Sequence, residues 1–436
     1  MVSSFSAQAS AGKFVDEYSI GDGQQPNGIA VDSQGDVWFT MGTGAALAEL
    51  NPSNLTVHSY RLPLPAGAIL NAWGVAVDNQ RGVVWLVDQE SNAVWKFTIS
   101  TDKFVEYPLP FPQSDPFQIA VDGNGNAWFT EITHDTIGEV TSGGTLTEYT
   151  VPTVPFTLGT NTKTNNTAPS GITIAPDGSV WFTESYAASL GHLADGRFES
   201  YNLSGRVLAP TGIGVDASGD VWFTQHGGSL ISEFNPATGA LKSFSTSLIG
   251  VYLSLPYFLK IDSHGNIWFN EHYGNAIGMF DPETSSMFEY RIPTSVPPLN
   301  ISGALTIALG PDGSPWFTEI YAGKIGMVNV SAPLGYSLSL GSLSGAISLQ
   351  SGEASTLNVT VTSGGGSNST LTTSVGSIVT TSITAKFDPG SGDGSFVSSL
   401  ALENAGGVEA PQGPIWLTVS AYTETLVVSQ VIELDT

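Results

Sequence analysis

Gly28-Ile-Ala-Val-Asp-Ser-Gln-Gly-Asp-Val-Trp-Phe-Thr40 is the stretch that decides the fold, because the same phrase returns along the chain. Close copies are Ser170-Gly-Ile-Thr-Ile-Ala-Pro-Asp-Gly-Ser-Val-Trp-Phe-Thr-Glu184 and Gly212-Ile-Gly-Val-Asp-Ala-Ser-Gly-Asp-Val-Trp-Phe-Thr224. The tryptophan of the phrase recurs every 41 to 53 residues, at Trp38, Trp85, Trp128, Trp181, Trp222, Trp268 and Trp316. Seven copies at this period predict an all-β fold, a seven-bladed β-propeller with four-stranded blades.

Each copy divides into short strands separated by turns. In the third copy we expect strands at 119–122, 127–130, 136–140 and 146–149. The Asp-X-X-Gly turns share residue types with calcium loops, but their glycines favour hairpin connections, so we assign them no metal. Neighbouring strand residues point to opposite faces, so we expect the Trp-Phe pairs to pack between blades rather than to stack on sugars.

The N-terminus supplies a strand that the last copy lacks. After Trp316 the chain reaches 331–335, interpreted as a linker, without a Phe-X-X-Tyr strand. Phe14-Val-Asp-Glu-Tyr18 has the pattern of the outer strand Phe104-Val-Glu-Tyr107. We therefore expect residues 1–330 to form a propeller that is closed by its first strand, which removes free sheet edges.

A second domain follows the repeats. From Tyr336 the composition shifts to Ser, Thr, Gly and Val, with strand-like runs at 337–340, 357–362, 378–386, 396–402, 415–421 and 426–434. This pattern predicts a small Ig-like β-sandwich over residues 336–436. Such modules tether or adhere, so we expect a cell-envelope partner for it.

The charge, the cysteine content and the length of apolar runs exclude or disfavour several classes of function. The chain of 436 residues carries 39 acidic and 13 basic side chains, a net charge of −26, which disfavours nucleic acid as a partner. It has no cysteine, hence neither disulfides nor thiolate sites. We see no run of about 18 apolar residues, the length of a membrane span. We expect an extracellular protein, with Met1 following a removed signal peptide and sequons at Asn54, Asn165, Asn202, Asn300, Asn329, Asn358 and Asn368.

One rim of the predicted ring is acidic. The residue after each second strand is in turn Met41, Asp88, Glu131, Glu184, Gln225, Glu271 and Glu319. Crowded carboxylates repel unless a cation neutralises them, which predicts a Mg²⁺ or Ca²⁺ site formed by Glu131, Glu184, Glu271 and Glu319. The alternative is that these repeated residues only cap backbone amides.

Histidines and aromatic residues occupy the same rim. His226 and His272 directly follow Gln225 and Glu271 in consecutive copies. An imidazole beside a carboxylate can act as a general base, so His272, His226 and Glu271 are the catalytic candidates; the alternative is that the histidines turn away into solvent. Trp73, Phe117 and Tyr257 stand where inner strands begin, and they predict an apolar pocket for a small or cyclic ligand.

Trp-Phe-Thr-Glu184, Trp-Phe-Thr-Glu319 and Trp-Phe-Asn-Glu271 followed by Asn275-Ala-Ile-Gly278 resemble the blade phrase of the virginiamycin B lyases, over residues 13–330. The resemblance implies a seven-bladed propeller that opens a cyclic depsipeptide by magnesium-assisted elimination at an ester, with a histidine base and metal-binding glutamates. In that family the base lies fourteen residues before the glutamate. The residues here are Asn27, Trp73, Phe117, Ser170, Thr211, Tyr257 and Leu305, so a base would have to be His226 or His272.

Three functions are compatible with these observations. The first is an enzyme, either a carbon–oxygen lyase or a lactonase-type hydrolase, that opens a cyclic ester in the central funnel. The second is an extracellular binding or adhesion protein, which the missing histidines favour. The third is a structural surface-layer component. Shared scaffolds host many functions, so the residues of the site must decide among them.

Overall fold

The computed structural model is built almost entirely of β-strands. It describes residues 2–435 except 22, 154–155, 159–161, 165, 204, 206, 208, 247–253, 333, 335, 342–346, 349–353, 364–367, 377–382, 394, 405–414 and 424. Within these residues the helical content is limited to two short 3₁₀ turns, η1 (Ile99–Thr101) and η2 (His226–Gly228). No helix in the described part of the chain is long and apolar enough to cross a membrane.

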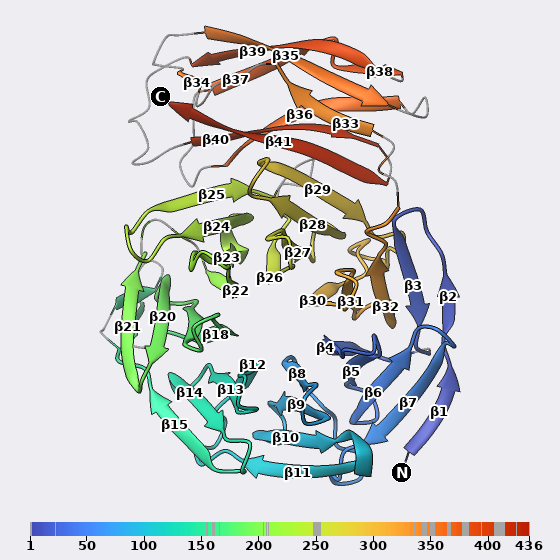
Figure 1. Ribbon diagram of the computed structural model, residues 1–436, viewed down its shortest axis with the longest axis vertical. Helices are drawn as coiled ribbons and strands as arrows, with labels where there is room; N and C mark the ends of the chain where they lie inside the picture. Colours follow the sequence, from blue (N-terminus) through green and yellow to red (C-terminus); the bar gives the residue numbers. More distant parts are fainter. Residues whose placement is uncertain are drawn as a thin grey trace.

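Antiparallel sheets stand around a ring (Figure 1), and each contains one motif tryptophan. Most have four or five strands, whereas the sheet that begins with β26 continues into the C-terminal strands and has nine. The first three sheets comprise β1 (Val2–Ser6), β4 (Pro26–Val31), β5 (Val37–Met41), β6 (Ala46–Asn51) and β7 (Thr56–Arg61); β8 (Val75–Asp78), β9 (Val83–Asp88), β10 (Ala93–Thr98) and β11 (Lys103–Pro108); β12 (Pro116–Val121), β13 (Ala127–Glu131), β14 (Thr136–Val140) and β15 (Leu146–Thr150).

The ring continues with β18 (Pro169–Ile174), β19 (Val180–Glu184), β20 (Ser189–Ala194) and β21 (Arg197–Asn202); β22 (Pro210–Val215), β23 (Val221–Gln225), β24 (Leu230–Phe234) and β25 (Leu241–Ser245); β26 (Pro256–Ile261), β27 (Ile267–Glu271), β28 (Ala276–Asp281) and β29 (Ser286–Arg291); β2 (Gln8–Ser10), β3 (Val15–Ser19), β30 (Ala304–Leu309), β31 (Pro315–Glu319) and β32 (Lys324–Val328). A separate hairpin joins β16 (Phe156–Leu158) and β17 (Thr162–Thr164).

The motif tryptophans are held inside the sheets. The Asp32 carboxylate accepts hydrogen bonds from the indole Nε1–H of Trp38 at 3.0 Å and from the turn amides of Gln34 and Asp36. The same aspartate–indole bond recurs for Trp128, Trp222 and Trp268. An outer-strand ring also stacks on most motif tryptophans, as Tyr60 does on Trp38 with centroids 5.9 Å apart. The repeated Asp therefore holds the turn between the first two strands, and the repeated Trp packs against the outer strand of the same sheet.

Buried side chains link each of several sheets to the next. Thr40 Oγ1 donates to the Ala72 carbonyl at 2.8 Å, and Thr224 Oγ1 donates to the Tyr257 carbonyl at 2.7 Å. Asn270, which replaces the usual threonine, donates from Nδ2 to the Ala304 carbonyl at 2.8 Å. Each bond satisfies a backbone carbonyl that packing removes from water. The threonine of the Trp-Phe-Thr phrase is thus an intersheet link.

The N-terminal residues add three strands at the outside of the ring. β3 pairs antiparallel with β32, β2 pairs with β3, and β1 pairs with β7 of the first sheet. Residues 2–10 therefore lie along two neighbouring sheets. The sequence pattern anticipated β3, but it gave no sign of β1 or β2, because five exposed residues of mixed Ser, Val and Phe have no distinctive periodicity.

Residues after Tyr336 form two sheets against the ring. One has the order β33-β35-β39-β37, from β33 (Tyr336–Leu340), β35 (Ala354–Ser363), β39 (Phe396–Asn404) and β37 (Ile383–Asp388). The other contains β36 (Asn368–Gly376), β38 (Ser391–Asp393), β40 (Ile415–Tyr422) and β41 (Leu426–Asp435), with β34 (Ile347–Ser348) parallel to β41. The predicted strand at 378–386 lies partly outside the described residues, since 377–382 are among the exceptions.

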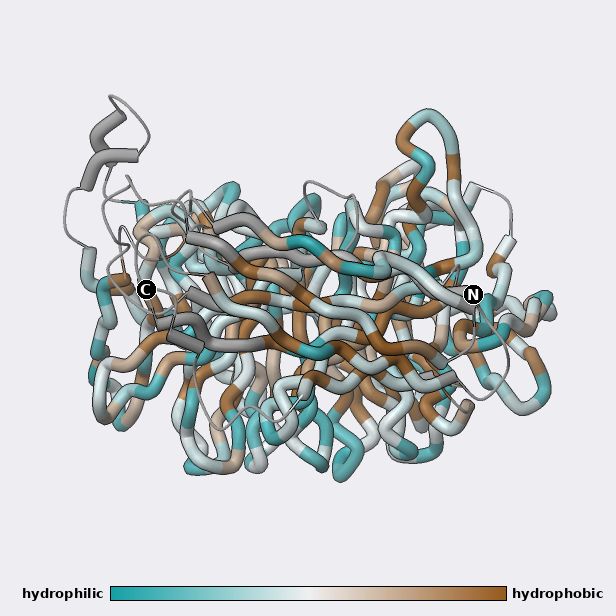
Figure 2. Tube along the Cα trace, turned by 90° about the horizontal axis from the view of Figure 1, so that it is seen from above, coloured by the Kyte–Doolittle hydropathy of each residue, from teal (hydrophilic) through white to brown (hydrophobic). Residues whose placement is uncertain are grey.

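The second of these sheets is continuous with a sheet of the ring. β41 pairs antiparallel with the outer strand β29, from Ser286↔Gln430 to Tyr290↔Leu426. Buried residues of both parts share one hydrophobic cluster, which includes Tyr290, Leu338 and Val419. Apolar stretches run through the middle of the molecule, whereas hydrophilic residues gather in the loops along one of its edges (Figure 2). The edge of β29 is therefore covered by the chain's own last strand.

Candidate functional site

Two histidines and a tyrosine meet where the strands β23, β26 and β27 open onto one rim. The imidazoles of His226 and His272 stack with centroids 5.3 Å apart and an interplanar angle of 7°. The ring of Tyr257 lies edge-on to both, at 5.1 Å from His226 and 5.9 Å from His272. The backbone amide of His226 donates to the Ala209 carbonyl, which fixes the start of η2. The structure thus brings the two predicted histidines together.

Both histidines are poised as neutral bases. Burial lowers the pKa of His226, and burial together with the neighbouring His226 lowers the pKa of His272 to about 4. His226 Nε2 and His272 Nδ1 are buried and find no hydrogen-bond partner among the described residues. Burial raises the pKa of Tyr257 to about 12, so its hydroxyl keeps its proton at neutral pH. The pair offers unprotonated ring nitrogens in an apolar setting.

The three predicted ligand-binding aromatic residues also meet. Trp73, Phe117 and Tyr257 lie with centroids 5.7 to 6.4 Å apart, although β8 and β12 stand across the ring from β26. Phe258, which sequence reasoning did not single out, packs on Phe117 at 5.8 Å. Phe117 and Phe258 are buried. These aromatic residues therefore pack across the ring instead of lining an open funnel.

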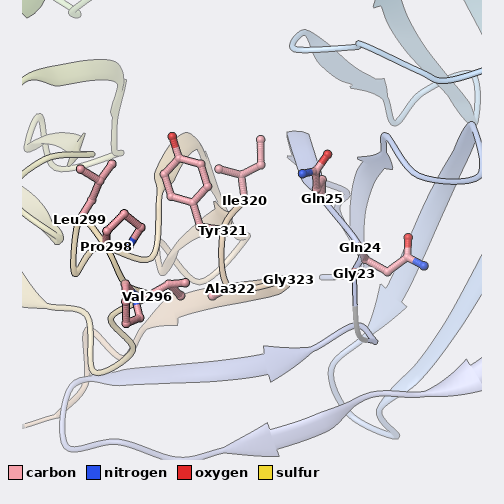
Figure 3. A pocket seen from close by; sticks show the side chains of 11 residues that line it. Gly23, Gln24, Gln25, Val296, Pro298, Leu299, Ile320, Tyr321, Ala322 and Gly323 are labelled. Atoms are coloured by element: carbon pink, nitrogen blue, oxygen red, sulfur yellow. The ribbon is translucent and has the colours of Figure 1, made fainter.

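Two grooves lead away from this aromatic cluster along the rim. The first has a volume of about 540 Å³ and is bounded by Trp73, Asn71, Arg61 and Glu90. The second, of about 620 Å³, adjoins it, because Gln25 and Ile320 line both. Figure 3 shows its apolar lining, with Gln24 and Gln25 on one side and Pro298, Leu299 and Tyr321 on the other. Their volumes suit a medium-sized ligand.

The predicted metal ligands do not come together. Glu131, Glu184, Glu271 and Glu319 end the strands β13, β19, β27 and β31 of four different sheets, and all four side chains are buried. Each faces the outer strand of its own sheet: Glu131 contacts Glu148, Glu271 contacts Glu289, Glu319 contacts Glu17, and Glu184 accepts from Ser200. Each glutamate therefore faces a group of its own sheet, although both carboxyl oxygens of Glu131 and of Glu319 lack a hydrogen-bond partner among the described residues.

Burial, together with a neighbouring carboxyl, raises the pKa of all four glutamates. Burial, then Glu148, raises the pKa of Glu131 to about 8, and burial, then Glu17, raises the pKa of Glu319 to about 9. Burial likewise raises the pKa of Glu184 to about 7, and it raises that of Glu271 well above its usual value.

The four predicted glutamates therefore do not converge on one site. Among the described residues there is no group of three or more histidines, aspartates or glutamates placed to hold an ion. Glu271 lies in the chain beside His272, but its carboxyl is engaged with Glu289. The sequence signal for these pairs was the outer-strand dipeptide Glu-Tyr, as in Glu148-Tyr149 of β15, which is separated from the Trp-Phe-Thr-Glu strand β13 by β14.

The chain is similar to known proteins in sequence profile and in structure. The sequence profile of the virginiamycin B lyase family matches residues 13–158 and 156–335. No curated protein matches the chain in sequence. Among solved structures, a streptogramin B lyase is 28% identical with a TM-score of 0.62, over 72% of this chain and 97% of that chain.

A second solved structure is a catalytically inactive histidine-to-alanine variant of virginiamycin B lyase from Staphylococcus aureus with quinupristin. It is 25% identical with a TM-score of 0.61, over 72% of this chain and 99% of that chain. The profile ends at residue 335, so the two C-terminal sheets lie outside the matched region. Over its repeat region, the chain belongs to the virginiamycin B lyase family.

Proposed function

We propose that the protein binds a cyclic ester ligand on this rim and opens it with a histidine base. The observation that carries the proposal is the stacked pair His226–His272, held neutral by burial and edge-on to Tyr257. A general base must be unprotonated at working pH and within reach of the proton that it removes. Membership of the lyase family supports the ester as the reacting group.

The chemistry is an elimination in which this chain supplies the proton acceptor. His272 or His226 takes a C–H proton on the alkoxy side of the ester, and the C–H electron pair forms a carbon–carbon double bond. The alkyl C–O bond breaks at the same time, and a carboxylate leaves. The second imidazole then accepts the proton or stabilises the imidazolium. The hydroxyl of Tyr257 donates a hydrogen bond to the leaving carboxylate oxygen. Atoms balance without water.

The adjoining grooves support a ligand larger than a simple lactone. Their lining is mainly apolar, with Pro298, Leu299 and Tyr321 on one segment and Trp73 at the aromatic cluster. Leu299 and Tyr321 are about half exposed, at 51% and 52%. A ligand with apolar or aromatic side chains would bury this surface at roughly 25 cal/mol per Å². A cyclic peptide ester has that character.

We also infer that the ring is a closed seven-bladed propeller on an extracellular protein, with an Ig-like sandwich at its C-terminus. The pairing of β3 with β32 supports closure, and so does the bond from Thr318 Oγ1 to the Asn27 carbonyl at 3.1 Å. The hydrophobic cluster shared by β35, β39, β40 and β41 supports the sandwich. The sequons and the low charged content support the location.

The test is a mass-resolved assay of purified protein with streptogramin B-type cyclic depsipeptides and lactones of graded ring size. An opened ring of unchanged mass is expected, and a gain of one water would replace elimination by hydrolysis. His226→Gln and His272→Gln should each lower turnover by at least ~10²-fold. His134→Gln is the matched control, since this half-buried histidine lies outside the pair. Equal turnover in all three variants would refute the assignment.

A second candidate function is ligand binding without chemistry. It rests on one observation: Asn27, Trp73, Phe117, Ser170, Thr211, Tyr257 and Leu305 stand where the family carries its base. Saturable binding of an unmodified depsipeptide, with no opened product after prolonged incubation, would establish it in place of the lyase reaction. The His272→Gln variant would then bind as the wild type does.

A further inference from the structure

Lys260 is the charged exception among equivalent positions of the repeat. It pairs in β26 with the motif residue Trp268. The residues that pair with the other motif tryptophans, or stand at the same register, are small and uncharged: Ala30, Ala76, Ala120, Thr173, Gly214 and Ala308. A lysine at one of these positions is not explained by packing, because the other copies pack without it.

The side chain of Lys260 borders a cavity on the axis of the ring. The cavity has a volume of about 30 Å³, and residues from β4, β12, β18, β22, β26 and β30 and from the start of β8 line it. Most of the surface that faces the cavity is polar, although aliphatic side chains stand around it: Ile29, Val75, Ile119, Ile172, Ile213, Leu259 and Ile307. Lys260 is exposed to solvent, in a space that the inner strands surround.

No acidic side chain faces the ammonium group. The polar residues of the lining, within the described chain, are Gln118 and Thr306, and both are engaged with backbone carbonyls, of Trp73 and Asn27 respectively. The nearest acidic residue in the chain is Asp262, directly after β26. Its carboxylate oxygens accept hydrogen bonds from the Trp268 indole, from the Asn266 side chain and from the His264 amide. Lys260 has no ion pair or hydrogen bond to any described residue.

The ammonium of Lys260 is open to solvent, but the strands around it displace part of its hydration shell and no described side chain replaces the lost contacts. A charge that loses part of its hydration without gaining a partner rises in free energy. The group can respond by losing its proton, and burial does lower the pKa of Lys260. It can also recruit an anion from solvent. The net charge of −26 gives no general attraction for anions, so a bound anion would mark a local site.

We propose that this axial cavity is a binding site for a small monovalent inorganic anion, held by Lys260. A cavity volume of about 30 Å³ leaves room for an occupant of about the size of one or two water molecules, which suits a halide. Trp73 lines both this cavity and the rim groove, and so it separates the anion from the ester site. The proposal does not depend on the ester chemistry.

The first experiment is a bromide soak of wild-type crystals. An anomalous peak within hydrogen-bond distance of Lys260 Nζ is expected, and a map without that peak would overturn the proposal. This measurement needs no variant. A peak that persists in Lys260→Ala would also overturn it, because the cavity would then hold halide without the lysine.

The second experiment is a titration of the unfolding temperature with sodium chloride against sodium gluconate at equal ionic strength, since gluconate is too large for the cavity. Chloride should raise the unfolding temperature saturably in the wild type and in Lys103→Ala, an exposed-lysine control, but not in Lys260→Ala. Alanine is the residue of four other copies, so folding should be retained. Equal chloride responses in the wild type and in Lys260→Ala would overturn the proposal, because chloride would then act elsewhere on the protein. A crystal peak with no response in solution would also overturn it, as an adventitious ion only.

Discussion

Lys324 and Glu17 form an ion pair of 3.1 Å between strands whose residues lie 307 positions apart in the chain. Both side chains also bond Thr294: Glu17 Oε1 accepts from its amide, and Lys324 Nζ donates to its hydroxyl at 2.6 Å. Glu17 is buried. One polar group of three residues thus ties β3, β32 and the segment leading to the apolar groove.

Deleting residues 1–20 should lower the unfolding temperature by roughly 10 °C or more, because it removes β3 and leaves the edge of β32 unpaired. Differential scanning calorimetry measures it. Deleting residues 2–6 is the control, since it removes only the exposed strand β1 and should cost far less. If the larger deletion left the unfolding temperature unchanged, β3 would not be part of the ring.

The low pKa of His272 predicts an acid-dependent loss of stability. Its folded-state pKa of about 4 lies below the model-peptide value of 6.5, so the unfolded chain binds this proton first. Its contribution is complete above pH 6.5 and is lost as the pH falls toward 4, by about 2 kcal/mol between pH 7 and pH 5. NMR titration of the imidazole should give a midpoint near pH 4; a midpoint near 6.5 would contradict the burial argument.

The paired glutamates predict the opposite pH dependence. Because the folded-state pKa values of Glu131 and Glu319 are raised, to about 8 and about 9, the folded protein holds protons that the unfolded chain releases above about pH 4.5. Their contribution to stability is complete below pH 4.5 and is lost as the pH rises through 8 to 9. Glu319→Gln and Glu131→Gln should each raise the unfolding temperature at pH 9, by roughly 2–4 °C, with little change at pH 5.

Two additions make the glutamate test sharper. Asp177→Asn is a control of opposite sign, since hydrogen bonds from Ser179 lower the pKa of Asp177, so this variant should gain nothing at pH 9. Adding Mg²⁺ to the wild type should leave the unfolding temperature unchanged. A rise with Mg²⁺ that disappears in Glu319→Gln would restore the metal site that the sequence predicted.

The junction between β29 and β41 predicts the behaviour of a shortened chain. Removing residues 331–436 uncovers the backbone of β29 and the apolar contacts of Met287 with Val427 and Val431. Exposed sheet edges associate, so the shortened protein should keep its β-sheet circular dichroism but elute as concentration-dependent oligomers. Light scattering after gel filtration measures this. A monomer of unchanged stability would show that β41 contributes little to the ring.

The repeat made the strands of the ring predictable, and it made the rim predictable as the place of the site. A period of 41 to 53 residues and fixed Trp-Phe-Thr positions specify which residues share an edge. They do not specify which way an edge side chain turns. His226 and His272 turn toward each other, whereas Glu131 and its counterparts turn into their sheets, toward outer-strand partners that the rim pattern does not contain. The junction of β41 with β29 was likewise invisible, because any edge strand can accept another.

The shared sheet also has a mechanical consequence. If a cell surface held the protein by its C-terminal sheets, tension would enter the ring through two routes, the segment between β32 and β33 and the ladder of β29 with β41. Five residue pairs of that ladder, from Ser286↔Gln430 to Tyr290↔Leu426, would share the load in shear. The ring would then be pulled as a rigid body, and the rim that carries the histidines would keep its shape under force.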